Sequence, residues 1–115
     1  MITEFGKCLR RIRLENGSLL KNMADKLCIT PAYLSSVENG KRKPTKELLS
    51  KLCEVYKFED YVKEELYNSF SRTINEITID TSNTNENQSN LGLVFARKIS
   101  TLSEDQIKAI SNLLK

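Results

Sequence analysis

The residues best placed to recognise another molecule lie together in the segment TPAYLSSVENGKRKP, residues 30–44. Thr30 can cap a helix that begins at the following proline, and Gly40 is typical of the residue after a helix end. Within this helix, residues 31–39, two apolar side chains three positions apart predict one buried face. The opposite face then carries small, polar or aromatic side chains without charge, and three basic residues follow Gly40. Such groups can hydrogen-bond to base edges and neutralise phosphates, which is the chemistry of nucleic-acid recognition.

A helix of this length is not stable alone in water, so neighbouring elements must hold it and display its polar face. An uncharged face of small side chains fits a DNA major groove, with the N-terminal end of the helix reaching the bases. The basic run would then lie where the duplex backbone passes. The side chains predicted at base edges are Thr30, Ala32, Tyr33 and Ser36. Those predicted at phosphates are Lys21, Asn22, Ser35, Asn39, Lys41, Arg42 and Lys43.

Apolar residues at helical spacing predict four further helices that position this one. The first covers about residues 3–16. Ser18 and Thr45 can cap the second and the fourth helix of the series. The fifth helix carries an apolar residue at every fourth position from Phe58 onward. The sequence therefore predicts a mainly α-helical protein that begins with a five-helix domain, residues 1–72.

The segment ADKLCITPAYLSSVENGKRKP, residues 24–44, resembles the helix-turn-helix of Xre/Cro-type regulators, the phage-repressor-like family. The shared pattern is an alanine in the first helix, a turn, Tyr-Leu-Ser, Glu-x-Gly, a basic stretch and Pro-Thr. The resemblance extends over about residues 5–58. It implies a domain that binds a double-stranded DNA operator in a transcriptional regulator, most often a repressor. It also implies that Arg13 of the first helix pairs with Glu38 of the helix at residues 31–39, which we call the reading helix.

Three positions depart from the family pattern. Cys28 stands where the turn usually has glycine, and a cysteine with positive φ is strained. Leu20 and Pro31 stand where glutamines usually brace the phosphate and read adenine. Base contact is therefore expected from other side chains, and Ala32 can touch a thymine methyl. DNA shape and the spacing of two half-sites are expected to add specificity. For Tyr33, half-buried packing is the alternative to contact with DNA.

The composition changes after the fifth helix. Residues 74–80, INEITID, alternate in polarity and predict a short strand, and residues 80–90 form a polar linker or exposed turn. Two more helices follow, and the second begins at Ser103 with a capping box. This C-terminal segment, residues 73–115, is too short to bury its own apolar stripes, so it must dock on the first domain or on a second copy.

Members of the family that the chain resembles usually dimerise through the part that follows the fifth helix. Either the predicted strand pairs with that of a second copy, or the tail helices pack across the twofold axis; the alternative is a tail folded back on its own domain. A homodimer would bind two half-sites one helical turn apart. An antitoxin-like protein is the competing interpretation, with a tail that binds a toxin or an anti-repressor. The residues predicted to dimerise are Ile77, Ile79, Leu91, Phe95, Ile107, Ile110 and Leu114.

Composition limits the other functions. Residues 1–57 carry 12 basic and 6 acidic residues, whereas residues 58–115 carry 6 and 9, so the N-terminal half suits a polyanion. The chain has no histidine, no Cys-x-x-Cys pair and no glycine-rich phosphate loop, so we expect no catalytic site, metal or cofactor. Cys8 and Cys53 lie on apolar stripes and are predicted to fill the core. No apolar run can span a bilayer and no signal peptide is apparent, so we expect a cytoplasmic protein of bacterial, phage or plasmid origin that joins the nucleoid when bound.

Overall fold

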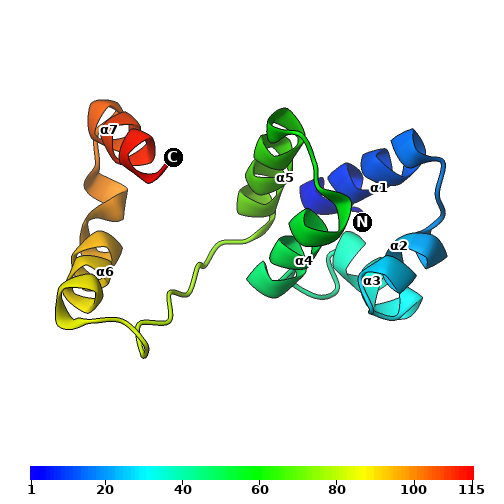
Figure 1. Ribbon diagram of the computed structural model, residues 1–115, viewed down its shortest axis with the longest axis horizontal. Helices are drawn as coiled ribbons and strands as arrows, with labels where there is room; N and C mark the ends of the chain where they lie inside the picture. Colours follow the sequence, from blue (N-terminus) through cyan, green and yellow to red (C-terminus); the bar gives the residue numbers. More distant parts are fainter. The chain divides into compact units, whose positions relative to one another are not determined.

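The computed structural model describes residues 1–115 and contains seven α-helices and one 3-10 helix, without a β-strand. The chain divides into two compact units, Met1–Ile77 and Thr78–Lys115 (Figure 1). The first unit holds α1 to α5, and the second holds α6, the 3-10 helix and α7. None of these helices combines the length and the apolar composition that a membrane span requires. The prediction of a mainly helical protein is therefore confirmed.

Threonine side chains cap three of the five helices of the first unit, α1, α3 and α4. The hydroxyl of Thr3 caps α1 by accepting from the Gly6 N–H at 3.0 Å. The hydroxyl of Thr45 caps α4 by accepting from the Leu48 N–H at 3.1 Å, which confirms the predicted cap. The bounds are α1 Glu4–Asn16, α2 Leu20–Lys26, α3 Pro31–Glu38, α4 Lys46–Tyr56 and α5 Asp60–Thr73.

One hydrophobic core holds the first unit together, and α1 packs against both α3 and α5 inside it. The rings of Phe5 and Phe70 meet edge to face with their centroids 5.5 Å apart. Burial is the largest of the effects that raise the pKa of the Cys8 thiol, so Cys8 stays uncharged and packs as a small apolar residue, as predicted. The fully buried apolar side chains come from all five helices and include Phe5, Leu9, Met23, Leu34, Leu52 and Leu66.

The start of α1 fits closely against the end of α3. The Thr3 N–H donates to the Glu38 carbonyl at 2.9 Å, and the Thr3 hydroxyl donates to the same oxygen at 3.3 Å. Gly6 lies so near this carbonyl that a Cβ atom on it would stand 2.3 Å from the oxygen. The side chains extend the contact, because Arg13 donates to both carboxylate oxygens of Glu38. The rest of the domain therefore fixes the position of α3 through α1.

The turn between α2 and α3 contains a cysteine in the left-handed conformation. Cys28 has φ 57°, as its position in place of the usual family glycine predicts. Its N–H donates to the Asp25 carbonyl at 3.2 Å, and the Ile29 N–H donates to the Ala24 carbonyl at 3.0 Å. The end of α2 thus holds the turn in a conformation that a side chain with a Cβ atom disfavours.

Replacing Cys28 by glycine is expected to raise the free energy of unfolding by about 0.5–1 kcal/mol. The left-handed conformation costs a residue with a Cβ roughly 1–2 kcal/mol, and the greater freedom of glycine in the unfolded chain offsets about 0.4–1 kcal/mol of that gain. Urea unfolding under reducing conditions measures the change. Cys28→Ala removes the thiol but keeps the Cβ, so it serves as the control and is expected to give no gain. Equal gains from both variants would contradict the backbone explanation.

The predicted strand at residues 74–80 is absent, so this part of the prediction is wrong. Residues 74–85 contain no helix and no strand. A strand needs a neighbouring strand to complete its backbone hydrogen bonds, and the single chain supplies none. Ile77 and Ile79 remain exposed. Their alternation with polar residues therefore marks an apolar surface rather than a strand.

The predicted cap of α2 at Ser18 is also wrong. Ser18 belongs to the end of α1, because its N–H donates to the Arg13 carbonyl at 2.9 Å after Gly17 turns the chain with φ 61°. The first turn of α2 is instead closed by Asn22, whose side-chain oxygen accepts from the Leu19 N–H at 2.8 Å. The N-cap position of α2 is Leu19, one residue later, and the Ser18 hydroxyl makes no capping hydrogen bond.

The second unit consists of helices that bury none of their residues. Its bounds are α6 Glu86–Lys98, the 3-10 helix Ile99–Thr101 and α7 Glu104–Leu114. Ser103 caps α7 and exchanges two hydrogen bonds with Gln106, which confirms the predicted capping box. A groove of about 510 Å³ with almost entirely apolar walls lies within this unit. We call it the tail groove, and its lining residues are Ile79, Gln88, Leu91, Gly92, Phe95, Ile110, Leu113 and Leu114.

Candidate nucleic-acid interface

The helix α3 is attached by one face and open on the other. Leu34, Val37 and Glu38 are buried, and the helix ends at Glu38, one residue before the predicted end. Pro31 and Ala32 are exposed at the N-terminal end. The remaining polar or aromatic residues of this region, Tyr33, Ser35, Ser36 and Asn39, are half-buried. The outward face is therefore uncharged and smooth enough to approach another molecule closely.

The N-terminal end of α3 presents a hydroxyl and a methyl group. The Thr30 hydroxyl accepts from the Tyr33 N–H at 3.0 Å and thereby caps the helix. Its own proton is left to donate to a ligand, because the capping bond uses only the oxygen. The Ala32 methyl is exposed beside it. Both groups lie at the N-terminal end of α3, the end of a recognition helix that faces the bases in helix-turn-helix complexes.

The C-terminal end of α3 uses two of the predicted contact residues for its own structure. Asn39 donates through Nδ2 to the Ser35 carbonyl at 2.9 Å and to the Ser35 hydroxyl at 3.3 Å. The amide oxygen of Asn39 is then the part of the side chain without a bond in the helix. An oxygen acceptor suits an N–H group of a base better than a phosphate, which also only accepts.

The basic run after α3 folds back toward the helix. Gly40 has φ 77°, and the N–H groups of Lys41 and Arg42 both donate to the Ser36 carbonyl, at 2.9 and 3.2 Å. Lys41, Arg42 and Lys43 are all exposed. The guanidinium carbon of Arg42 lies 5.6 Å from the centre of the Tyr33 ring, within the range of a cation–π contact. The structure thus brings together two residues that the sequence assigns to different roles.

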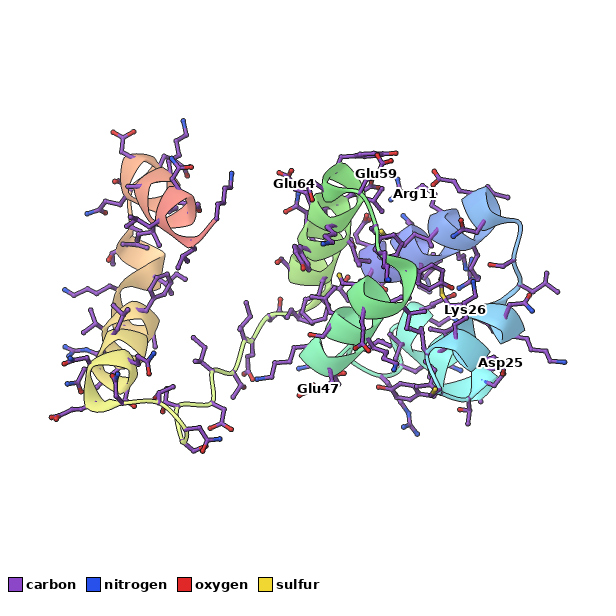
Figure 2. The ribbon with its side chains drawn as sticks, in the orientation of Figure 1. Arg11, Asp25, Lys26, Glu47, Glu59 and Glu64 are labelled. Atoms are coloured by element: carbon purple, nitrogen blue, oxygen red, sulfur yellow. The ribbon has the colours of Figure 1, made fainter.

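The arginines of α1 are already paired with carboxylates. Arg13 is 8% exposed and Glu38 is 2% exposed, so their ion pair is buried. Arg10 lies 3.6 Å from the same carboxylate, and Arg11 pairs with Glu65. Figure 2 shows Arg11 beside the start of α5. The arginines of α1 therefore have partners within the domain, whereas the cations of the basic run have no carboxylate partner.

The helix α2 supports α3 and adds two predicted contacts. Ala24 is fully buried where the two helices pack, as expected for a close crossing. Lys21 and Asn22 are exposed in the first turn of α2. The Asn22 oxygen is occupied by the Leu19 N–H, so its amide nitrogen is the group left to donate outward.

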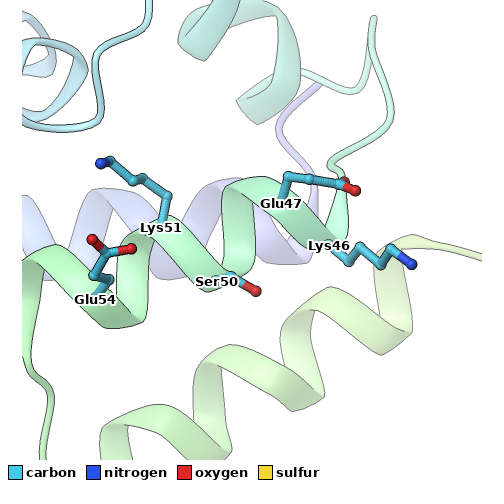
Figure 3. Close-up of a pocket in the computed structure, with 5 residues that line it drawn as sticks. All are labelled: Lys46, Glu47, Ser50, Lys51 and Glu54. Carbon is cyan, nitrogen blue, oxygen red and sulfur yellow. The ribbon is translucent and has the colours of Figure 1, made fainter. Parts of the chain in front are cut away.

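An open hollow lined by charged and polar residues lies on α4 rather than beside α3. It measures about 330 Å³ and is lined by Lys46, Glu47, Ser50, Lys51 and Glu54. Figure 3 shows that all five side chains come from this one helix. A small-molecule site needs walls from several elements and converging polar groups, so this depression does not resemble one. No group of three or more cysteine, aspartate and glutamate side chains is placed to hold a metal ion.

Two features of the interface are not apparent in the sequence. Tyr33 and Arg42 are separated by a helix end and a loop, and their contact depends on the positive φ of Gly40. The hydrogen bonds from Thr3 to the Glu38 carbonyl join residues that are 35 positions apart. Neither contact has a periodic signal along the chain, so only the folded structure reveals them.

The helices α2 and α3 and the turn between them are similar in arrangement to a helix-turn-helix. Residues 9–59 match the helix-turn-helix family, which confirms the resemblance seen in the sequence. The chain is also similar to transcriptional regulator ClgR of Mycobacterium tuberculosis strains CDC 1551 / Oshkosh and ATCC 25618 / H37Rv. Each is 38% identical over 48 residues, which cover 42% of this chain and 43% of the relative. The chain thus spans less than half the length of these relatives, and no solved structure matches it.

Proposed function

We propose that this protein is a sequence-specific regulator of transcription that binds double-stranded DNA with α3 in the major groove. The observation that carries the proposal is the uncharged outer face of α3, fixed from behind by the buried Arg13–Glu38 pair and followed by exposed cations. The helix-turn-helix match and the similarity to a named transcriptional regulator support it. Repression is the expected outcome, because a protein bound across a promoter excludes the polymerase.

The proposed role of each residue depends on which of its side-chain groups is exposed and not already hydrogen-bonded within the domain. Thr30, Ala32 and Ser36 are assigned to base edges because they lie on the outward side of α3 and its cap. Lys41 and Lys43 are assigned to phosphates because they are exposed cations beside that face. Lys21, Asn22 and Ser35 remain proposed backbone contacts. Asn39 is assigned to a base edge instead, because its free amide oxygen cannot donate to a phosphate.

The decisive experiment is binding to the DNA upstream of the protein's own gene against a scrambled duplex. Fluorescence anisotropy across a salt series gives the affinity, and the mass of the complex gives the number of chains. We expect preference for the upstream DNA with two chains per site. Equal, weak and strongly salt-dependent binding to both duplexes would reject sequence-specific autoregulation.

Changing Lys41 and Lys43 together to alanine is expected to weaken binding equally on specific and scrambled DNA. Each phosphate contact contributes about 0.9 to the slope of log affinity against log salt, so the slope should decrease by about 2 for each bound chain and by about 4 for two chains per site. A salt titration of both duplexes measures it. The double variant Lys108→Ala and Lys115→Ala removes the same charge from α7 and the C-terminus and serves as the control. An unchanged salt slope would show that these two lysines do not contact phosphates of the DNA.

We further propose that the C-terminal segment, residues 73–115, joins two copies of the chain. The tail groove is apolar, and it belongs to a unit without a buried residue. Exposed apolar surface of this kind on a soluble chain marks an interaction site. Five of the predicted dimer residues line the groove: Ile79, Leu91, Phe95, Ile110 and Leu114. A dimer would also supply the second reading helix that an operator with two half-sites requires.

Leu91→Glu is expected to convert the dimer to a monomer, because it places a charge in the tail groove. Operator affinity should then fall about 100-fold, because the second domain no longer binds as a tethered partner. Sedimentation analysis measures the mass, and anisotropy measures the affinity. Leu14→Glu changes a leucine of α1 that is 81% exposed and should leave both values unchanged. A wild-type chain that stays monomeric at high concentration would contradict the proposed dimer. The tail groove would then be assigned to binding another protein, such as a toxin or an anti-repressor.

A further inference from the structure

The proposed reading surface lacks a side chain that discriminates strongly between bases. Ala32 offers only a methyl group, and the Ser36 hydroxyl bonds to several bases with little preference. Strong discrimination comes from a planar side chain that makes two hydrogen bonds to one base edge. The sequence of α3, PAYLSSVE, contains no arginine, asparagine or glutamine. Such a group must therefore reach the groove from outside the helix.

Arg42 supplies a planar group beside α3. Its guanidinium lies over the ring of Tyr33, which belongs to the first turn of the helix. The loop backbone is fixed at the other end, because the Arg42 N–H donates to the Ser36 carbonyl. The arginine side chain therefore runs back along α3 toward the end that meets the bases.

Tyr33 is itself held by the body of the domain. Its side chain is half-buried and packs against the hydrophobic core. The ring lines a cleft together with Ile29 of the turn and Thr45 and Leu48 at the start of α4. A guanidinium held over an aromatic ring by a cation–π contact makes no hydrogen bond there, so its N–H donors stay available for a partner. The Tyr33 ring is thus a platform that orients Arg42 before DNA arrives.

We propose that Arg42, held on Tyr33, reads one guanine in each half-site through paired hydrogen bonds to O6 and N7. This inference rests on the proposed function, because it requires a sequence-specific complex with duplex DNA. Arginine and guanine form the commonest specific pair in the major groove. Stacking on Tyr33 reduces the side-chain freedom that Arg42 loses on binding. Tyr33 is then a positioning residue that acts through Arg42 and does not read a base itself.

The test uses the full-length protein and a duplex that the wild type selects from a library with a randomised centre. Arg42→Lys keeps the positive charge but loses the planar pair of donors, whereas Arg42→Ala loses both. We expect Arg42→Lys to bind the selected duplex about 10- to 100-fold more weakly than the wild type and to bind random DNA equally well. Selection with Arg42→Lys should lose the guanine preference at one position of each half-site.

Two further measurements separate the arginine from its platform. Tyr33→Phe keeps the ring and is expected to bind like the wild type, whereas Tyr33→Leu removes the platform and should show part of the same loss at the same position. Replacing the assigned guanine by 7-deazaguanine removes the N7 acceptor. This change should weaken the wild type and leave Arg42→Ala unaffected.

The contrary results are distinct. If Arg42→Lys matches the wild type on both duplexes, while Arg42→Ala weakens both and lowers the salt slope by about 1 per bound chain, Arg42 contacts phosphate and the inference is overturned. If the wild type selects a common sequence that no Arg42 variant alters, the inference fails and the proposed function stands. A wild type that selects no common sequence rejects the proposed function, and the inference with it.

Discussion

Glu38→Ala is expected to lower the free energy of unfolding by about 3–5 kcal/mol, because it leaves the Arg13 guanidinium buried without its carboxylate. Arg13 is 8% exposed, so water cannot replace the lost partner without opening the domain. Its remaining polar contact is the Met23 sulfur at 3.4 Å, a weak acceptor. The end of α3 loses its tie to α1 at the same time, so DNA binding should weaken together with stability. Guanidinium unfolding followed by circular dichroism measures the change.

Two variants separate the buried charge from other effects of this substitution. Glu54→Ala changes an exposed glutamate of α4 and should cost less than about 0.5 kcal/mol. The double variant Arg13→Met and Glu38→Leu removes both charges, and such replacements are often neutral or stabilising, by about 1–4 kcal/mol. It should therefore recover most of the stability lost by Glu38→Ala. A double variant as unstable as the single one would show that packing, not the unpaired charge, dominates.

Gly6→Ala is expected to lower the free energy of unfolding by about 2 kcal/mol, although alanine is the better helix former. The added Cβ would stand 2.3 Å from the Glu38 carbonyl oxygen and 2.9 Å from two other backbone atoms of Glu38. Overpacking of this kind costs about 1–3 kcal/mol or more, and the backbone position puts it at the upper end, while helix propensity returns roughly 1 kcal/mol. The helices α1 and α3 must move apart, so operator affinity should fall as well. Chemical unfolding and anisotropy measure the two effects.

Gly92→Ala is the matched control for that substitution. Gly92 also lies inside a helix, α6, but a Cβ there would meet only the Thr81 methyl carbon at an ordinary 3.6 Å. Helix propensity should then dominate, and the helical content of the chain should stay equal or increase. A loss from Gly92→Ala as large as that from Gly6→Ala would show that helical glycines matter in this chain for another reason.

The sequence predicts the elements of this protein where a local rule acts alone. Leu34 and Val37 set the buried face of α3, and Thr45 and Ser103 cap their helices as their positions indicate. The pairing of Arg13 with Glu38 follows from the family resemblance, because residues 25 positions apart have no local signal. These elements fix the architecture of the domain and the face that it displays.

The same reasoning fails where two elements compete or meet. Ser18 has the chemistry of a cap, but after the turn at Gly17 the Ser18 N–H donates to the Arg13 carbonyl at the end of α1. Ile77 and Ile79 have the pattern of a strand, but no second strand is present to pair with them. The stack of Arg42 on Tyr33 depends on how a loop returns to a helix, which periodicity does not describe. Such contacts between elements decide which side chains are free to bind.

The segment that joins the two units, residues 74–85, contains no helix or strand, and each unit keeps its own internal packing. Mutations that alter α3 therefore leave the tail groove unchanged, and the reverse also holds. In evolutionary terms, the DNA-binding surface of α3 and the tail groove can change independently of each other. If the tail joins two chains as proposed, then after a gene duplication one copy could acquire a new half-site preference while its tail still joins the parent copy. The resulting mixed dimers would recognise hybrid operators, so two genes could yield three regulatory specificities.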